Sequence, residues 1–123
     1  MVRGVFDGYV ERLVDAALRG ADEKLALDPV VLDMRRLVDS FDALVLTSGA
    51  SDRQVRAIAD EIERAIAVTT TVHPLRVEGL AQSQWIALDY GDVIVHVFDL
   101  ASRDYYDLEH LWSAAPALRA PTR

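Results

Sequence analysis

The chain has 123 residues, 51% of them hydrophobic, which is enough for one hydrophobic core but not for two. No stretch reaches the roughly 20 uncharged apolar residues of a membrane-spanning helix, and the first residues lack the apolar core of a secretory signal. Twenty acidic residues against thirteen Lys and Arg give a formal net charge of −7, which argues against direct binding to nucleic acid. With no cysteine, the chain offers neither disulfides nor thiolate ligands for zinc. These features predict one cytoplasmic domain, expected over residues 1–113.

The first part of the chain predicts a helix followed by a β-hairpin. Apolar residues recur at helical spacing over about the first twenty positions, and Gly20 is a candidate for the end of this helix. Two short apolar runs, residues 30–32 and 43–46, then predict two strands. Because the connection between them is short, we expect the strands to be antiparallel.

A loop of small residues, 47–51, leads from the second strand into a second helix. Ser51 and Gln54 match the S-x-x-Q capping box that marks a helix start. The β-branched residues at 68–72 have low helix propensity, so this helix is expected to fray there, before Pro74.

Three further strands are predicted in the second half of the chain. Residues 74–77 form a short candidate strand, and residues 84–88 and 93–98 are joined by a three-residue turn typical of a hairpin. The last of these strands is apolar on both faces apart from His96, as expected for the central strand of a sheet. The prediction is therefore an α/β fold with a mixed five-stranded β-sheet and packed helices.

A short helix is predicted to close the domain. Tyr105, Leu108, Leu111 and Trp112 are spaced as one helical face, and Asp104 is a candidate N-cap. The tail, residues 114–123, contains two prolines and no apolar periodicity, and is predicted to be disordered.

Four blocks between Lys24 and Trp112, in this order, resemble the ribosomal silencing factor (Iojap-like) family. They are residues 24–33 (KLALDPVVLD), residues 42–51 (DALVLTSGAS) with RQV at 53–55, VEG at 77–79 with WIALDYGD at 85–92, and HVF at 96–98 with RDYYDLEHLW at 103–112. The last block is the most specific. Leu44 departs from the family, which usually has an aromatic residue at that position.

This resemblance implies a mixed sheet related to the nucleotidyltransferase fold, no cofactor and, often, a homodimer. It also implies a protein that is not an enzyme. Members of the family bind the large ribosomal subunit through its ribosomal protein fourteen, block joining of the small subunit and so repress translation. An acidic protein suits such a target, because an acidic surface is attracted to a basic ribosomal protein and is repelled by the phosphates of RNA.

The candidate binding residues are Trp85, Asp89, Tyr90 and Asp92, with Arg103 and Tyr106 as further candidates. Trp85 and Asp89 share parity on one strand, so both project from the same face, whereas Ile86 and Leu88 point toward the core. A tryptophan beside an acidic residue is suited to anchor a basic partner. The alternative is a tryptophan that is simply buried under a helix.

Other chemistries have weaker support in the sequence. Asp89, Asp92 and His96 are of metal-ligand type, but four residues along a strand span about 13 Å, so we interpret Asp92 as a hairpin cap and His96 as a hydrogen-bonded core or interface residue. The loop 47–51 precedes a helix and could hold a phosphate, yet it lacks a Walker lysine. A nucleotidyltransferase-like enzyme and a self-associating structural module are the alternative functions.

Overall fold

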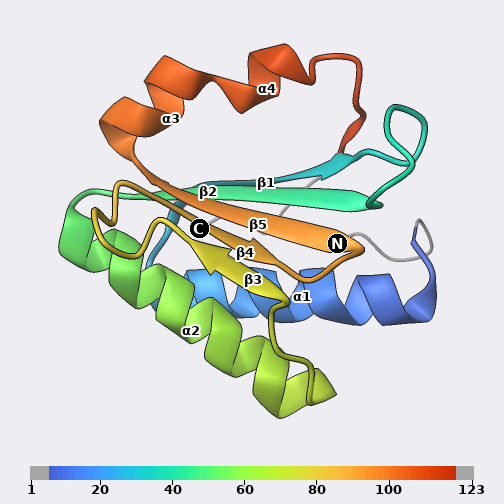
Figure 1. The fold of residues 1–123 in the computed structure, drawn as a ribbon, viewed down its shortest axis with the longest axis horizontal. Coiled ribbons are helices and arrows are strands. Elements are labelled where there is room, and N and C mark those ends of the chain that lie inside the picture. The colour runs from blue at the N-terminus through green and yellow to red at the C-terminus, as the bar shows by residue number, and fades with distance from the viewer. Residues whose placement is uncertain (1–5, 119–123) are drawn as a thin grey trace.

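The computed structural model describes residues 6–118, in which a β-sheet lies between two helical layers (Figure 1). The elements follow in the order α1 (Gly8–Glu23), β1 (Leu27–Asp33), β2 (Ala43–Gly49), α2 (Asp52–Thr70), β3 (Arg76–Glu78), β4 (Trp85–Asp89), β5 (Val93–Asp99), α3 (Leu100–Tyr106), α4 (Leu108–Leu111) and β6 (Ala117–Leu118). Within this part of the chain, no helix has both the length and the apolar character needed to cross a membrane.

The sheet is mixed, with the strand order β3-β4-β5-β2-β1-β6. β2 and β5 are parallel, and every other neighbouring pair is antiparallel, which confirms both predicted hairpins. All seven residues of β2 are buried, because helices cover both of its faces. The prediction of residues 93–98 as an inner strand is also confirmed, since β5 lies between β4 and β2.

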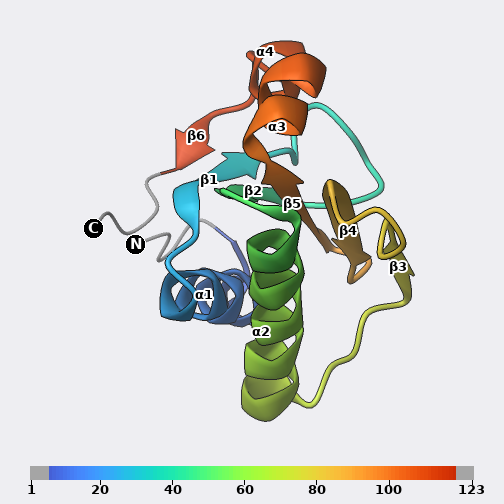
Figure 2. The same cartoon turned by 90° about the vertical axis from the view of Figure 1, so that its left-hand side faces the viewer.

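Each face of the sheet has its own hydrophobic core. α1 and α2 pack side by side on one face, over a core that includes Ile86 and Leu88 of β4. α3 and α4 lie on the other face, above a smaller core built around Leu46 and Phe98 (Figure 2). In Figure 2, β3 and β4 extend to one side of α3 and α4, so the face of these two strands that points away from α2 has no helix above it.

The helix starts follow ordinary capping chemistry. The Ser51 hydroxyl accepts a hydrogen bond from the Gln54 backbone N–H at 3.1 Å, as the capping box predicts, although the Gln54 side chain accepts from the N–H of Ala50 instead of Ser51. α3 is capped by Asp99, whose carboxylate accepts from the Ser102 N–H at 2.7 Å. The prediction of Asp104 as the cap is therefore wrong, because the helix begins directly after β5.

The sequence also misplaced three boundaries. Gly20 does not end α1 but lies inside it, and residues 47–49 belong to β2, so the loop before α2 is shorter than predicted. β6 is a sixth strand, which pairs with β1, and Ala115 just before it is buried. The prediction of disorder is thus wrong for residues 114–118, where a two-residue strand leaves no periodic signal; residues 119–123 lie outside the described residues.

Gly20 sits where α1 crosses α2. A Cβ atom at this position would lie 2.8 Å from the Ile62 Cα and 2.9 Å from the Glu61 carbonyl oxygen, both of which belong to the α2 backbone. The absence of a side chain therefore allows the two helices to approach closely enough to close the larger core.

We expect Gly20→Ala to lower the free energy of unfolding by about 1–2 kcal/mol. Overpacking against a backbone costs about 1–3 kcal/mol, which exceeds the gain of about 1 kcal/mol in helix propensity. Urea denaturation followed by circular dichroism measures the change. Gly8→Ala is the matched control, since its Cβ would meet only the end of the Arg12 side chain at 3.5 Å. A Gly20→Ala variant as stable as the wild type would contradict the close crossing.

Candidate functional site

Four aromatic side chains gather where β4, β5 and α3 meet, and we call them the aromatic cluster: Trp85, His96, Phe98 and Tyr106. The antiparallel register of β4 and β5 sets Trp85 opposite Phe98 and Ala87 opposite His96, so these side chains share one face of the sheet. The Trp85 ring stacks on Phe98, with centroids 5.0 Å apart, and meets Tyr106 at 4.5 Å. The cluster is the largest aromatic grouping in the described part of the chain.

A hydrogen bond fixes the centre of this cluster. The Trp85 indole Nε1–H donates to Nδ1 of His96 at 2.8 Å. An imidazole nitrogen accepts only when it carries no proton, so His96 must be neutral, with its proton on Nε2. Burial lowers the pKa of His96 to about 4, which favours the same neutral form.

The cluster reaches from the core to the surface. Phe98 is buried, Trp85 is half-buried, and Tyr106 is 48% exposed. Tyr105 packs edge-on against Tyr106 and is exposed in turn. A surface that combines an ordered indole ring with exposed tyrosines has the composition typical of protein-binding sites.

Beside the cluster lies the uncovered face of β3 and β4, which we call the open face. Strand pairing sets Arg76 opposite Asp89 and Glu78 opposite Ala87, so these four side chains project from the sheet on the same side as Trp85. Arg76 and Glu78 are exposed, while Ala87 and Asp89 are half-buried. The predicted shared face of Trp85 and Asp89 is therefore confirmed, as is the inward direction of Ile86 and Leu88.

The β4–β5 turn differs from its prediction. The Asp89 carboxylate accepts a hydrogen bond from the Gly91 N–H at 2.8 Å, so Asp89 holds this turn, a role predicted for Asp92. Asp92 is exposed, and its backbone carbonyl accepts from the N–H groups of Asp42 and Ala43. The exposed Asp92 side chain is thus available to a partner at the tip of the hairpin.

Tyr90 is not part of an exposed tip. Its side chain is only 5% exposed and packs in the core beneath the sheet, where burial raises the pKa of the hydroxyl. Among the described residues, no group accepts or donates a hydrogen bond to this hydroxyl. The prediction of Tyr90 as part of an exposed hairpin tip is wrong, because strand alternation continues into the turn and sets Tyr90 on the face of Ile86 and Leu88.

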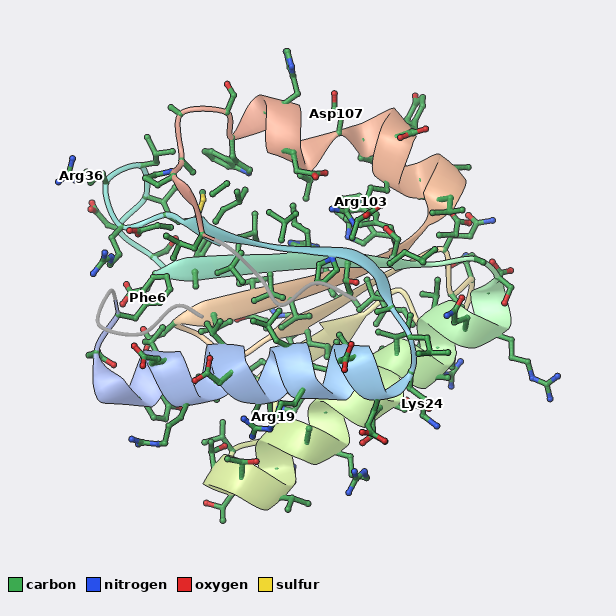
Figure 3. All side chains as sticks on the ribbon, turned by 180° about the vertical axis from the view of Figure 1, so that it is seen from behind. Phe6, Arg19, Lys24, Arg36, Arg103 and Asp107 are labelled. Carbon is green, nitrogen blue, oxygen red and sulfur yellow. The ribbon has the colours of Figure 1, made fainter. Side chains whose placement is uncertain are left out.

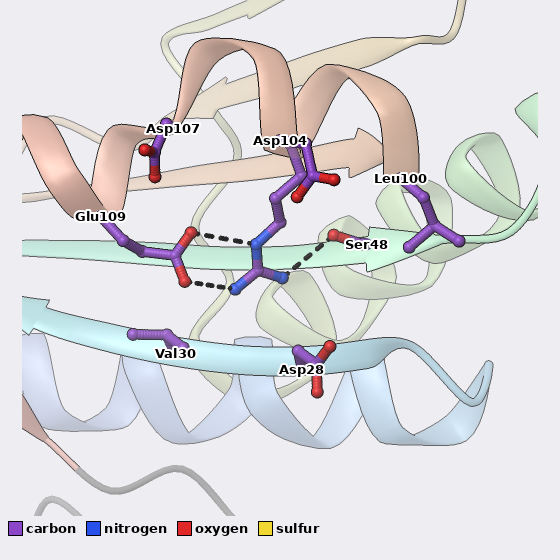
Figure 4. A pocket seen from close by; sticks show the side chains of 8 residues that line it. Asp28, Val30, Ser48, Leu100, Asp104, Asp107 and Glu109 are labelled. Carbon is purple, nitrogen blue, oxygen red and sulfur yellow. Dashed lines mark hydrogen bonds and ion pairs between the residues drawn. The ribbon is translucent and has the colours of Figure 1, made fainter.

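Arg103 is turned inward, toward the sheet (Figure 3). Its guanidinium donates to both carboxylate oxygens of Glu109, at 3.2 and 3.0 Å, and to the Ser48 hydroxyl at 3.0 Å (Figure 4). The spacing of six residues did not predict a pair between Arg103 and Glu109, but the left-handed backbone at Asp107 (φ 48°) turns the chain between α3 and α4 and brings the two together. Arg103 thus fastens α3 and α4 to β2.

Arg103 also forms part of a surface pocket of about 540 Å³ between α3 and β1. The pocket is lined by Asp28, Val30, Ser48, Leu100, Arg103, Asp104, Asp107 and Glu109. Within residues 6–118, no three His, Asp or Glu side chains are grouped so that they could hold a metal ion. The pocket lies over β1 and β2, whereas the aromatic cluster lies over β4 and β5, so Arg103 faces the pocket and Tyr106 faces the cluster.

Comparison with known proteins gives consistent matches along the chain. A family model described as ribosomal silencing factor during starvation matches residues 9–122. The ribosomal silencing factor RsfS of Halalkalibacterium halodurans is 37% identical over 108 residues, which cover 88% of this chain and 92% of that protein. The ribosomal silencing factor RsfS of Bacillus subtilis is 38% identical over 104 residues, 85% of this chain and 87% of that protein. A crystal structure of a Chromobacterium violaceum protein matches with a TM-score of 0.81 at 30% identity, covering 92% of this chain and 90% of that one.

The low pKa of His96 predicts a loss of stability in mild acid. In the unfolded chain this histidine titrates near 6.5, above its folded value of about 4, so on acidification the unfolded state takes up a proton first. The free energy of unfolding should therefore fall between pH 6.5 and 4, by up to about 1.4 kcal/mol per pH unit.

Urea denaturation at pH 7, 6 and 5 measures this slope. His96→Phe is the control, because it cannot titrate and should show a flatter dependence over the same range. If NMR finds that the His96 imidazole titrates near pH 6.5 in the folded protein, the environment described above is incorrect.

Proposed function

The chain belongs to the ribosomal silencing factor family, and from this premise we propose how it acts as a ribosome-associated repressor of translation. It binds a protein of the large ribosomal subunit through the aromatic cluster and the open face. The bound domain then occupies space that the small subunit needs, and the two subunits cannot join. The partner implied by the family resemblance is large-subunit ribosomal protein fourteen, in the cytoplasm.

The observation that carries this proposal is the Trp85 indole at the border of an uncovered sheet face. Trp85 is held by a hydrogen bond and by ring contacts with Phe98 and Tyr106, yet it is half-buried and not enclosed. Interface hot spots are enriched in such tryptophan and tyrosine anchors, which give large contact area at low entropic cost. Trp85 and Tyr106 are therefore the proposed anchors.

Charge distinguishes the partner. The net charge of −7 repels phosphate backbones. Asp89, at the far end of β4 and about 13 Å from Trp85, and Asp92, in the turn that follows, add carboxylates to this surface. A basic ribosomal protein therefore fits this surface better than bare RNA does. Asp89 and Asp92 are proposed as rim residues, and Arg103 is proposed to act indirectly, by holding the helix that carries Tyr106.

Two further properties follow the family resemblance and are proposed with this function. The domain acts by steric exclusion, without catalysis or a cofactor. In the absence of its ribosomal partner it forms a homodimer, since an exposed aromatic surface favours self-association. A relation of the sheet to the nucleotidyltransferase fold remains a hypothesis.

Trp85→Ala should weaken binding to purified large ribosomal subunits by about 2 kcal/mol or more, roughly thirtyfold in dissociation constant. The reason is that the substitution removes the largest anchor from the proposed interface. Binding is measured by co-sedimentation of the purified protein with the subunits through a sucrose gradient. The same assay, with small subunits added, tests whether the wild type prevents subunit joining.

Tyr9→Ala is the matched control, because Tyr9 is an exposed aromatic residue on α1, in the helical layer on the opposite side of the sheet. It should bind as the wild type does. Thermal melts of both variants separate lost contacts from lost folding. If folded Trp85→Ala binds with wild-type affinity, another surface must carry recognition.

Without ribosomal partners, light scattering at micromolar concentration should give about twice the monomer mass of 13.6 kDa. Burial of the exposed aromatic surface between two copies is the physical reason for this expectation. A monomer mass throughout the micromolar range would overturn the proposed dimer but would leave the ribosome-binding proposal intact.

A further inference from the structure

His96 has an unused hydrogen-bonding group. Its Nδ1 accepts from the Trp85 indole, so the proton of the neutral ring must lie on Nε2. Among the described residues, no group accepts a hydrogen bond from this Nε2–H. This Nε2 is also accessible to solvent. Within residues 6–118, the one fully enclosed side-chain nitrogen or oxygen without a hydrogen-bond partner is the Tyr90 hydroxyl, not His96 Nε2.

The position of His96 makes this donor relevant to binding. His96 faces Ala87 across the β4–β5 ladder, so it projects on the same side of the sheet as Trp85 and the open face. It is half-buried, with Phe98 stacked against it at 5.9 Å. When a docking protein removes such a donor from water, binding is weakened by the cost of burying an unpaired N–H, unless the docking protein supplies an acceptor.

We propose that His96 is a positioning and specificity residue that bridges the Trp85 indole and an acceptor oxygen of the protein partner. Nδ1 fixes the orientation of the indole before binding, and Nε2–H donates to a carbonyl or carboxylate oxygen in the complex. This inference rests on the proposed function, because it requires that a protein docks on this face. In this proposal, His96 keeps the Trp85 ring rigid and also requires that the partner supply a hydrogen-bond acceptor.

The neutral ring is essential to this bridge. A protonated imidazole carries N–H groups on both nitrogens, so its Nδ1 would repel the indole N–H and could not accept a hydrogen bond from it. Burial keeps His96 neutral across the physiological range. The bridge is therefore a permanent feature of the free protein and does not switch with physiological pH.

Two variants separate the halves of the bridge. The Asn side chain in His96→Asn places an oxygen close to the position of Nδ1 but has no group at the position of Nε2, so it can still accept from Trp85. The ring in His96→Phe keeps the stacking on Phe98 but removes both hydrogen bonds. Both substitutions leave the residue's place in β5 unchanged.

Nitrogen NMR of the free protein tests the first half. The wild type should show an unprotonated Nδ1, a protonated Nε2 and a Trp85 indole N–H that exchanges slowly with water. The chain contains one other tryptophan, and a Trp85→Phe spectrum assigns the signal. The slow exchange should persist in His96→Asn and be lost in His96→Phe. A protonated Nδ1 in the wild type, or an unchanged indole signal in His96→Phe, would overturn the proposal.

Co-sedimentation with purified large ribosomal subunits tests the second half. His96→Asn should bind several-fold more weakly than the wild type, and His96→Phe about tenfold or more, because the two variants lose one and two hydrogen bonds respectively. Wild-type affinity of folded His96→Asn would overturn the bridge to the partner. If the wild type itself does not bind, the proposed function fails, whereas the NMR result on the indole stands independently of it.

Discussion

The width of a helix relative to the spacing of strands determines which part of this molecule is available for binding. A helix with its side chains is about 10 Å wide, and neighbouring strands lie about 4.8 Å apart, so one helix covers about two strands. α1 and α2 together cover most of one face of the six-stranded sheet. On the other face, α3 and α4 follow one another along a single line; α3 contacts β5 and β2 and reaches β4 only through the ring contact of Tyr106 with Trp85, so β3 and the rest of β4 have no helix above them (Figures 1 and 2).

The uncovered strands are protected against pairing with strands of other chains. β3 has only three residues, it follows Pro74, and it carries the charged side chains Arg76 and Glu78. Short, charged strands next to proline are a common means of preventing edge-to-edge association. A partner is therefore favoured on the face of these strands and not along their edge, and the aromatic cluster lies beside that face.

Single-strand periodicity predicted much of this arrangement. It placed Trp85 and Asp89 on one face and Ile86 and Leu88 on the other, since alternation is a local property of a strand. The same rule, continued by one residue, would also have placed Tyr90 in the core. By contrast, the contact of Trp85 with His96 depends on the register between β4 and β5, and the pairing of Arg103 with Glu109 depends on a left-handed residue at Asp107. Neither register nor backbone handedness can be read from the residues alone.

In the proposed interface, the fixed position of Trp85 contributes to affinity because the ring is already ordered in the free protein. Gly79 packs directly against the backbone of β4 at Trp85. A Cβ atom at position 79 would lie 1.9 Å from the Trp85 carbonyl oxygen, so this close contact requires glycine. The indole is held at the same time by His96, Phe98 and Tyr106. An anchor that is already ordered in the free protein loses little conformational entropy on binding, so more of its contact energy remains as affinity. In the same proposal, the carboxylates of Asp89 and Asp92 act at longer range and mainly speed the encounter with a basic partner. The proposed recognition is thus divided between charges that favour the approach of the partner and an immobilised ring that prolongs the complex.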